Sequence, residues 1–180
     1  MRLLITGIIV FLILFYFYLI WPRLSRKRQI RPFLHTMFAH RGYHCIEKGI
    51  PENSIPSFRA AISHGYGIEL DVHLTRDGRL VVIHDGDLER MCGVPGRVAE
   101  KTAEELAAIR LAGSEEHIPL LEEVLPLFAG RAPLVVELKT DRHGAAALAR
   151  DTVDCLDRFS IDYCVESFDP RPLRWLRRHR

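Results

Sequence analysis

The sequence predicts an α/β fold of the (β/α) TIM-barrel type, an incomplete barrel of about five βα units preceded by one N-terminal transmembrane helix. Strand-like apolar runs alternate with segments of helical periodicity, as in a parallel sheet with helical crossovers. Polar residues also gather at the carboxyl ends of these strands, where (β/α) barrels place their active sites. A doubly wound sheet is the less favoured alternative, because its functional residues would come from one switch point rather than from every strand.

The central stretch of the chain contains two strand-like runs, Ile68–Leu74 and Arg79–His84, joined by a tight turn. Because side chains alternate along a strand, Glu69 and Asp71 share one face of the first run. Two carboxylates this close repel each other, and a divalent cation with oxygen ligands would neutralise them. The second run is apolar and ends at the ionisable pair His84-Asp85. A solvated edge hairpin with one polar face is the alternative interpretation.

Length and composition limit the possible classes of protein. The chain has 180 residues, a formal net charge of +2 and 48% hydrophobic residues, which allows roughly one domain. No basic face dominates, so a nucleic-acid partner is not expected. The four cysteines are scattered and form no Cys-x-x-Cys pair, which argues against a zinc site or a disulfide framework.

The N-terminal segment Leu3–Trp21 is almost purely apolar and uncharged, close to the roughly 20 residues that a bilayer-spanning helix needs. Basic residues follow it, and a small-residue cleavage site is missing. We therefore interpret residues 1–22 as an uncleaved transmembrane anchor and 23–35 as a basic linker; a signal peptide is the alternative. By the positive-inside rule, the domain at 36–180 is expected to face the cytoplasm of a single-pass membrane protein.

The elements after the linker follow in order. A short apolar run over 36–39 leads into His40-Arg41-Gly42, where Gly42 can take a positive φ and turn the chain. Asn53 or Ser54 can cap a helix over 55–64. The later elements expected are an irregular segment at 86–101, a helix opened by Thr102 with a capping box to Glu105, a helix over 119–128 interrupted near Pro126, a strand at 134–139, a helix over 145–159, a strand at 163–168 and a last helix from Asp169-Pro170.

Short motifs extend over nearly everything after the basic linker. They are, in order, His40-Arg41-Gly42, Pro51-Glu52-Asn53-Ser54, Glu69-Leu70-Asp71-Val72, Thr75-Arg76-Asp77-Gly78, Val82-Ile83-His84-Asp85, Ile118-Pro119-Leu120 with Leu121-Glu122-Glu123-Val124-Leu125, Glu137-Leu138-Lys139 and Ser167-Phe168. Each motif is weak alone, but the ordered set resembles the glycerophosphodiester phosphodiesterase family.

The resemblance implies a TIM barrel that hydrolyses glycerophosphodiesters to an alcohol and glycerol 3-phosphate, with Ca²⁺ or Mg²⁺ as the cofactor. The implied roles are metal ligation by Glu69, Asp71 and Glu137, acid/base catalysis by His40 and His84, and phosphate binding by Arg41 and Lys139. Taken alone, Glu137 and Lys139 also fit an internal salt bridge without a metal.

These residue types suit the chemistry of a phosphodiester, which is an anion that repels an incoming nucleophile. A divalent metal and a guanidinium would neutralise its non-bridging oxygens, and the planar fork of arginine can hold two of them. Two histidines could take a proton from the nucleophile and give one to the leaving group near neutral pH. Direct attack by water and attack by the glycerol hydroxyl through a cyclic phosphate both remain open.

The strands can be counted only as far as 163–168, about three βα units short of a full barrel, which implies a C-terminally truncated domain. Two other functions stay open: a lysophospholipase D or phospholipase C-like lipid phosphodiesterase, and an inactive membrane-tethered partial barrel. The expected partners are a glycerophosphodiester or lysophospholipid-type substrate and, through the N-terminal helix, a membrane.

Overall fold

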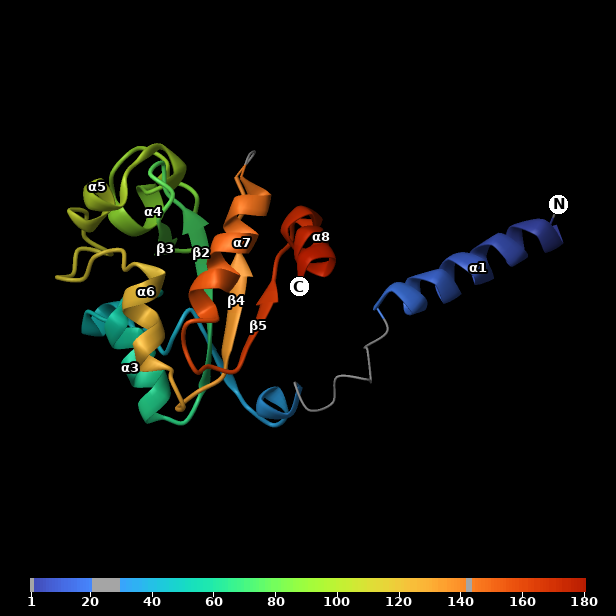
Figure 1. Cartoon of the computed structure of the whole chain (residues 1–180), viewed down its shortest axis with the longest axis horizontal. Helices are drawn as coiled ribbons and strands as arrows, with labels where there is room; N and C mark the ends of the chain where they lie inside the picture. The colour runs from blue at the N-terminus through green and yellow to red at the C-terminus, as the bar shows by residue number, and fades with distance from the viewer. Residues whose placement is uncertain (1, 21–29, 142–143) are drawn as a thin grey trace. The chain divides into compact units, whose positions relative to one another are not determined.

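The computed structural model describes residues 2–20, 30–141 and 144–180. The chain divides into two compact units, Met1–Arg31 and Pro32–Arg180 (Figure 1). Residues 21–29 lie outside the described residues, and they include positions 23–29 of the predicted basic linker at 23–35. All residues of the predicted site belong to the second unit.

The first unit contains the helix α1, Arg2–Ile20. Its large apolar side chains from Leu4 to Phe17 are exposed. A helix that spans a bilayer needs about 20 mainly apolar residues. Among the described residues, no helix combines the length and the apolarity needed for this, so the predicted transmembrane anchor at 1–22 is not supported.

The second unit is built on a five-stranded sheet. Its strands are β1 (Phe38–His40), β2 (Gly67–Leu74), β3 (Leu80–Val82), β4 (Leu134–Leu138) and β5 (Tyr163–Glu166). Strands β1, β2, β4 and β5 are parallel and adjacent in that order, which confirms the predicted parallel α/β architecture. The register sets His40 opposite Glu69 and Asp71 opposite Glu137, so predicted site residues are neighbours across the sheet.

Strand β3 is the exception, because it returns antiparallel to β2. Residues 75–79 alone connect the two strands, whereas a parallel crossover needs a dozen or more residues. The predicted count of about five βα units is therefore wrong for the described residues, which contain four parallel strands. Because β4 occupies one edge of β2, β1 and β3 share the other edge. The chain leaving β3 comes back to the middle of β2, where the N–H of Ile83 donates to the C=O of Asp71 at 3.1 Å.

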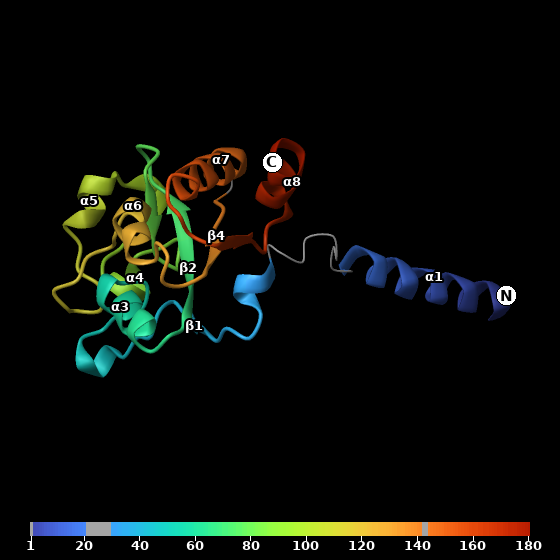
Figure 2. The same ribbon diagram turned by 60° about the horizontal axis from the view of Figure 1, so that its bottom comes forward.

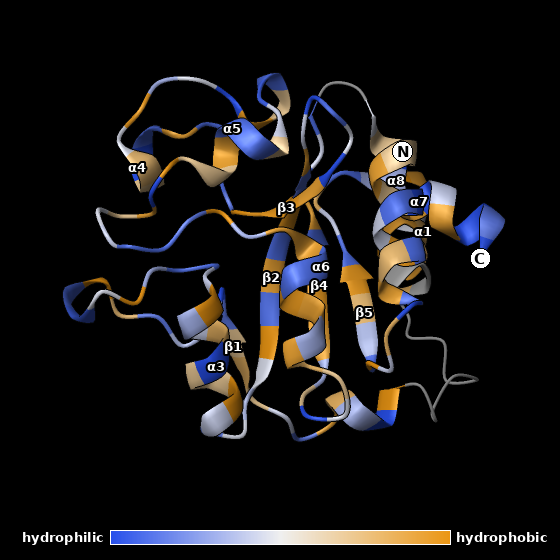
Figure 3. Cartoon of the chain, turned by 60° about the vertical axis from the view of Figure 1, so that its left-hand side comes forward, coloured by the Kyte–Doolittle hydropathy of each residue, from blue (hydrophilic) through white to orange (hydrophobic). Residues whose placement is uncertain are grey.

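Helices cover one face of the sheet (Figure 2). They include α3 (Ile55–Ser63), α6 (Leu121–Val124) with the short 3₁₀ turn η5 (Leu125–Leu127), and α7 (Ala145–Leu156); α8 (Pro170–His179) follows β5. The predicted helix at 119–128 is thus two short pieces with Pro126 in the second, as its interruption suggested. Apolar residues of β2 and β4 pack against these helices, and Figure 3 colours both strands and helices by hydropathy. Phe58 of α3 contacts Phe128 edge-on, at 5.7 Å between ring centroids.

A smaller core lies under the segment between β3 and α6. This segment contains the short helices α4 (Glu89–Cys92) and α5 (Ala103–Ala107), and the 3₁₀ turn η4 (Val98–Glu100). Thr102 caps α5 and exchanges hydrogen bonds with Glu105, so the predicted capping box is confirmed. Eight buried side chains join these pieces into one cluster: Val81, Ile83, Leu88, Met91, Val98, Leu106, Leu111 and Ile118.

Candidate functional site

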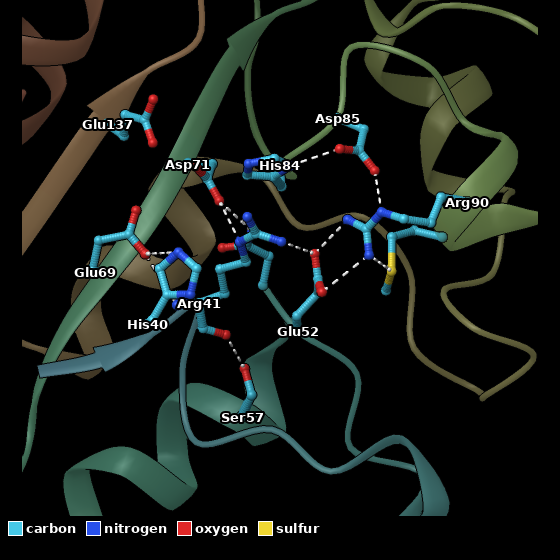
Figure 4. Close-up of polar contacts among 12 residues, drawn as sticks. His40, Arg41, Glu52, Ser57, Glu69, Asp71, His84, Asp85, Arg90 and Glu137 are labelled. Carbon is cyan, nitrogen blue, oxygen red and sulfur yellow. Dashed lines mark hydrogen bonds and ion pairs between the residues drawn. The ribbon is translucent and has the colours of Figure 1, made fainter. Parts of the chain in front are cut away.

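Three carboxylates meet on the face of the sheet that carries the polar side chains. Glu69 and Asp71 lie on β2 and Glu137 on β4. One oxygen of each lies within 4.8 Å of the others, and all three side chains are buried (Figure 4). The alternation along β2 therefore placed Glu69 and Asp71 on one face as predicted, and the pairing of β2 with β4 added Glu137.

The cluster concentrates negative charge in a buried place. Burial, reinforced by the charge of Asp71, raises the pKa of Glu69 to about 7. The Nζ of Lys139 offsets part of this charge at 3.1 Å from Asp71 and 2.7 Å from Glu137. Within the described part of the chain, Asp71 Oδ1 is buried and accepts no hydrogen bond besides that ion pair. Oxygen ligands with a lone pair left over suit a hard divalent cation.

Arg41 is tied to the carboxylates by its backbone as well as its side chain. Its N–H donates to Glu69 Oε2 at 3.0 Å, and its Nε lies 3.5 Å from Asp71 Oδ2. Its φ of 58° and the φ of 81° at Gly42 form the sharp turn that the sequence predicted after β1. The hydroxyl of Ser57 in α3 donates to the C=O of Arg41 and holds the turn against the helix.

Replacing Gly42 by alanine tests this turn. A Cβ at Gly42 would lie 2.3 Å from the Oγ of Ser57, whereas one at Gly65, which has a similar φ of 74°, would meet nothing within 4 Å. We expect Gly42→Ala to cost about 3 kcal/mol in the free energy of unfolding, from the left-handed backbone plus the clash. Gly65→Ala should cost about 1–2 kcal/mol from the backbone alone. Urea unfolding measures both, and equal losses would contradict the close approach.

The two predicted histidines have different surroundings. His40 ends β1, its side chain is 69% exposed, and its Nε2 lies 3.9 Å from Glu69 Oε2. His84 is half-buried, and its Nδ1 lies 2.6 Å from Asp85 Oδ1. Burial tends to raise the pKa of Asp85, but the hydrogen bonds of His84 and Arg90 outweigh it and lower that pKa. Because an ionised carboxylate only accepts, Nδ1 of His84 carries a proton and Nε2 is left for other chemistry.

A cavity of about 580 Å³ opens beside the carboxylates. His84, Glu137 and Lys139 line it, together with Phe168, which is 94% exposed. His40 instead lines a second hollow of about 360 Å³ with Phe38 and Tyr43. Figure 4 shows the His40 ring on the Glu69 side of Arg41 and the His84 ring on the Asp85 side. The structure thus brings five other predicted residues (Arg41, Glu69, His84, Glu137 and Lys139) around Asp71 and places His40 at the rim.

Some residues of the site were not singled out from the sequence. Asn53, expected only as a possible helix cap, donates from Nδ2 to Asp71 Oδ2 at 2.9 Å, and Ser54 is the actual cap of α3. Asp85 was noted only as the partner of His84. Arg90 lay in a segment predicted to be irregular, and no local pattern could link it to Glu52, which is 38 residues away and which it contacts. Such contacts depend on how distant segments pack.

A largely parallel sheet with carboxylates, basic side chains and imidazoles gathered at the carboxyl ends of its strands places the protein in the α/β class, and (β/α) barrels carry their active sites at that end. The sequence model of the glycerophosphoryl diester phosphodiesterase family matches residues 40–171, most of the second unit. The chain belongs to this family, as its motifs indicated.

Relatives and solved structures agree with this assignment. A protein named glycerophosphodiester phosphodiesterase from Bacillus altitudinis is 37% identical over 139 residues, covering 70% of this chain and 54% of the relative. A crystal structure of a glycerophosphodiester phosphodiesterase from Parabacteroides distasonis matches with a TM-score of 0.69 and 32% identity, over 80% of this chain and 60% of that one.

A third similar protein is an Oleispira antarctica phosphodiesterase, solved in complex with the product sn-glycerol-3-phosphate. It matches with a TM-score of 0.73 and 26% identity, over 81% of this chain and 62% of that chain. The chain spans about half the length of the curated relatives it matches.

Proposed function

We propose that this chain carries out the metal-dependent hydrolysis of a glycerophosphodiester to an alcohol and glycerol 3-phosphate. The observation that carries the proposal is the convergence of three buried carboxylate oxygens within 4.8 Å, with Lys139 and Arg41 in contact with Asp71. Family membership and the product named for the Oleispira antarctica structure support the substrate class.

The donor set fits a divalent ion such as Ca²⁺ or Mg²⁺. Glu69, Asp71 and Glu137 would hold it, because all three offer hard oxygens and, among the described residues, Asp71 Oδ1 makes no hydrogen bond beyond its ion pair with Lys139. When bound, the ion would withdraw charge from a phosphate oxygen and stabilise the negative charge of the transition state. Lys139 already offsets part of the charge on two of these carboxylates, so it lies where a phosphate oxygen would also be attracted.

The protein's own side chains would divide the remaining work. Arg41 and Lys139 bind the non-bridging oxygens and orient the diester. One imidazole takes a proton from the nucleophile, either water or a glycerol hydroxyl, as the nucleophile's oxygen bonds to phosphorus; on the second route water then opens the cyclic phosphate. The other gives a proton to the alcohol oxygen as its bond to phosphorus breaks. His84 suits either step, because Asp85 fixes its tautomer and leaves Nε2 free to accept or donate.

The test is the hydrolysis of glycerophosphocholine by the purified full chain, with and without EDTA. We expect release of choline and glycerol 3-phosphate that stops with the chelator and returns when Mg²⁺ or Ca²⁺ is added. Phosphorus NMR separates this cleavage from the alternative that gives glycerol and phosphocholine. Turnover unaffected by EDTA, or no turnover with either metal, would contradict the proposal.

A comparison of soluble and lipid substrates separates the proposed activity from a lysophospholipase D. Preference for glycerophosphocholine over lysophosphatidylcholine supports the glycerophosphodiester assignment, and the reverse preference contradicts it. The cytoplasmic orientation of the domain stays a prediction from the sequence.

A further inference from the structure

Arg90 contacts two acidic residues that lie on different sides of the site. Its Nη2 and Nη1 donate to the Glu52 carboxylate at 2.6 and 3.1 Å, and its Nε donates to Asp85. Glu52 also accepts from Nη1 of Arg41 at 3.0 Å. Asp85 in turn lies against Nδ1 of His84. One guanidinium therefore connects the phosphate-binding arginine with the imidazole of His84, as the dashed lines of Figure 4 show.

The carboxylates of Glu52 and Asp85 are both held in the ionised form, which accepts hydrogen bonds. The Glu52 side chain is only 9% exposed and lies between two guanidinium groups. Its burial raises the pKa of the carboxyl, but the hydrogen bond and charge of Arg90, followed by those of Arg41, lower it further than burial raises it. The same balance lowers the pKa of Asp85. Each therefore stays ionised and can hold a charge-assisted hydrogen bond on either side.

The helix that carries Arg90 is short but well fixed. Leu88, the residue before α4, and Met91, which follows Arg90 in the helix, are buried in the smaller core. Gly93, with a φ of 67°, ends the helix. The Arg90 side chain itself is 45% exposed, so its removal opens no cavity in that core. Its contacts with Glu52 and Asp85 face the site, and its Nη1 also lies 3.0 Å from the Sδ of Met91 in the smaller core.

We propose that Arg90 is a positioning residue that sets Arg41 and His84 together, and this rests on the proposed function. Without it, Arg41 is the one guanidinium left against Glu52, and the carboxylate can draw it away from Asp71, which lies 3.5 Å from the Nε of Arg41. Asp85 also loses the contact that fixes it against the ring of His84. Lysine could reach only one of the two carboxylates, because it lacks the planar fork of arginine.

The first test compares Arg90→Ala and Arg90→Lys with Arg79→Ala in the full chain. Arg79 is the matched control, because it is 47% exposed and pairs with Glu122 away from the site. We expect Arg90→Ala to lower kcat/KM about 10²-fold, the scale of a misplaced reacting group, at an unchanged melting temperature. Arg90→Lys should recover less than half of the loss on a logarithmic scale, and Arg79→Ala should leave activity unchanged. If the loss of kcat/KM in Arg90→Ala were no larger than the fraction of the variant that is unfolded, the inference would be overturned.

The second test needs no turnover. Nitrogen NMR of the imidazole rings should show His84 protonated at Nδ1 in the wild type and exchanging between tautomers in Arg90→Ala. The dissociation constant of glycerol 3-phosphate, measured by calorimetry, should rise about tenfold, the cost of one displaced charge-assisted contact. Ring signals and affinity both equal to the wild type would overturn the inference. A wild type that hydrolyses no diester while both changes occur would refute the proposed function and leave the positioning role standing.

Discussion

Replacing His84 by alanine is expected to lower kcat about 10²- to 10⁴-fold, the contribution of one general acid or base. His40→Ala should have an effect of the same size, because the reaction needs one proton removed and one supplied. The ring of His84 is held by Asp85 at 2.6 Å, whereas His40 is exposed and held only by the 3.9 Å contact with Glu69. Steady-state rates with glycerophosphocholine at saturating metal measure both losses.

The control for the histidines is His117→Ala. The His117 side chain is 39% exposed and its Nε2 lies 3.9 Å from Glu123, so it resembles His40 in its contacts but lies outside the cluster. Its replacement should change kcat less than twofold, the usual range for a residue outside the site. If His84→Ala stayed within threefold of the wild type while folded, the acid/base assignment would be wrong.

Replacing Glu137 by glutamine should remove most of the metal-dependent activity. The change keeps the size of the side chain but deletes one of three charges, and it leaves Lys139 with Asp71 as its partner. Because a bound metal contributes several kcal/mol to the transition state, we expect kcat/KM at fixed Mg²⁺ to fall about 10³-fold. Calorimetric titration of Mg²⁺ should show weaker binding, and higher Mg²⁺ should restore part of the rate.

Glu122→Gln is the matched control for the metal ligand. Glu122 is exposed on α6, pairs with Arg79, and lies away from the carboxylate cluster. Its replacement should leave both the metal affinity and the rate unchanged. Equal metal affinity in Glu137→Gln and the wild type would remove Glu137 from the ligand set.

The sequence allowed the local parts of the site to be predicted. Alternation along a strand was enough to place Glu69 and Asp71 on one face, and the spacing of Thr102 and Glu105 was enough for the capping box. The motifs indicated Glu137 by resemblance. That β4 pairs with β2 and sets Glu137 opposite Asp71 could not be read from the chain, because it depends on which strands pair across a long sequence separation.

The failures have physical causes as well. The connection between β2 and β3 is too short for a crossover, so it already implied that β3 is antiparallel to β2. The count of about five βα units overlooked this, because it was based on the alternation of strands and helices. The contacts of Arg90 and Asn53 depend on side chains from distant segments meeting in space, for which neither periodicity nor spacing gives a signal. The anchor at 1–22 was predicted from the length and apolarity of Leu3–Trp21 and from the basic residues after it, and the described helices do not support it.

The hairpin of β2 and β3 has a consequence for how the protein tolerates change. Residues 75–79 act as a spacer that decides how far along β2 the chain returns, and therefore where the ring of His84 stands relative to Asp71. Substitutions that keep this spacer at its present length preserve the placement. An insertion or deletion of a single residue would shift the pairing by one and send alternate side chains to the opposite face. Mutational tolerance in the hairpin should therefore depend on the number of its residues more than on their identity.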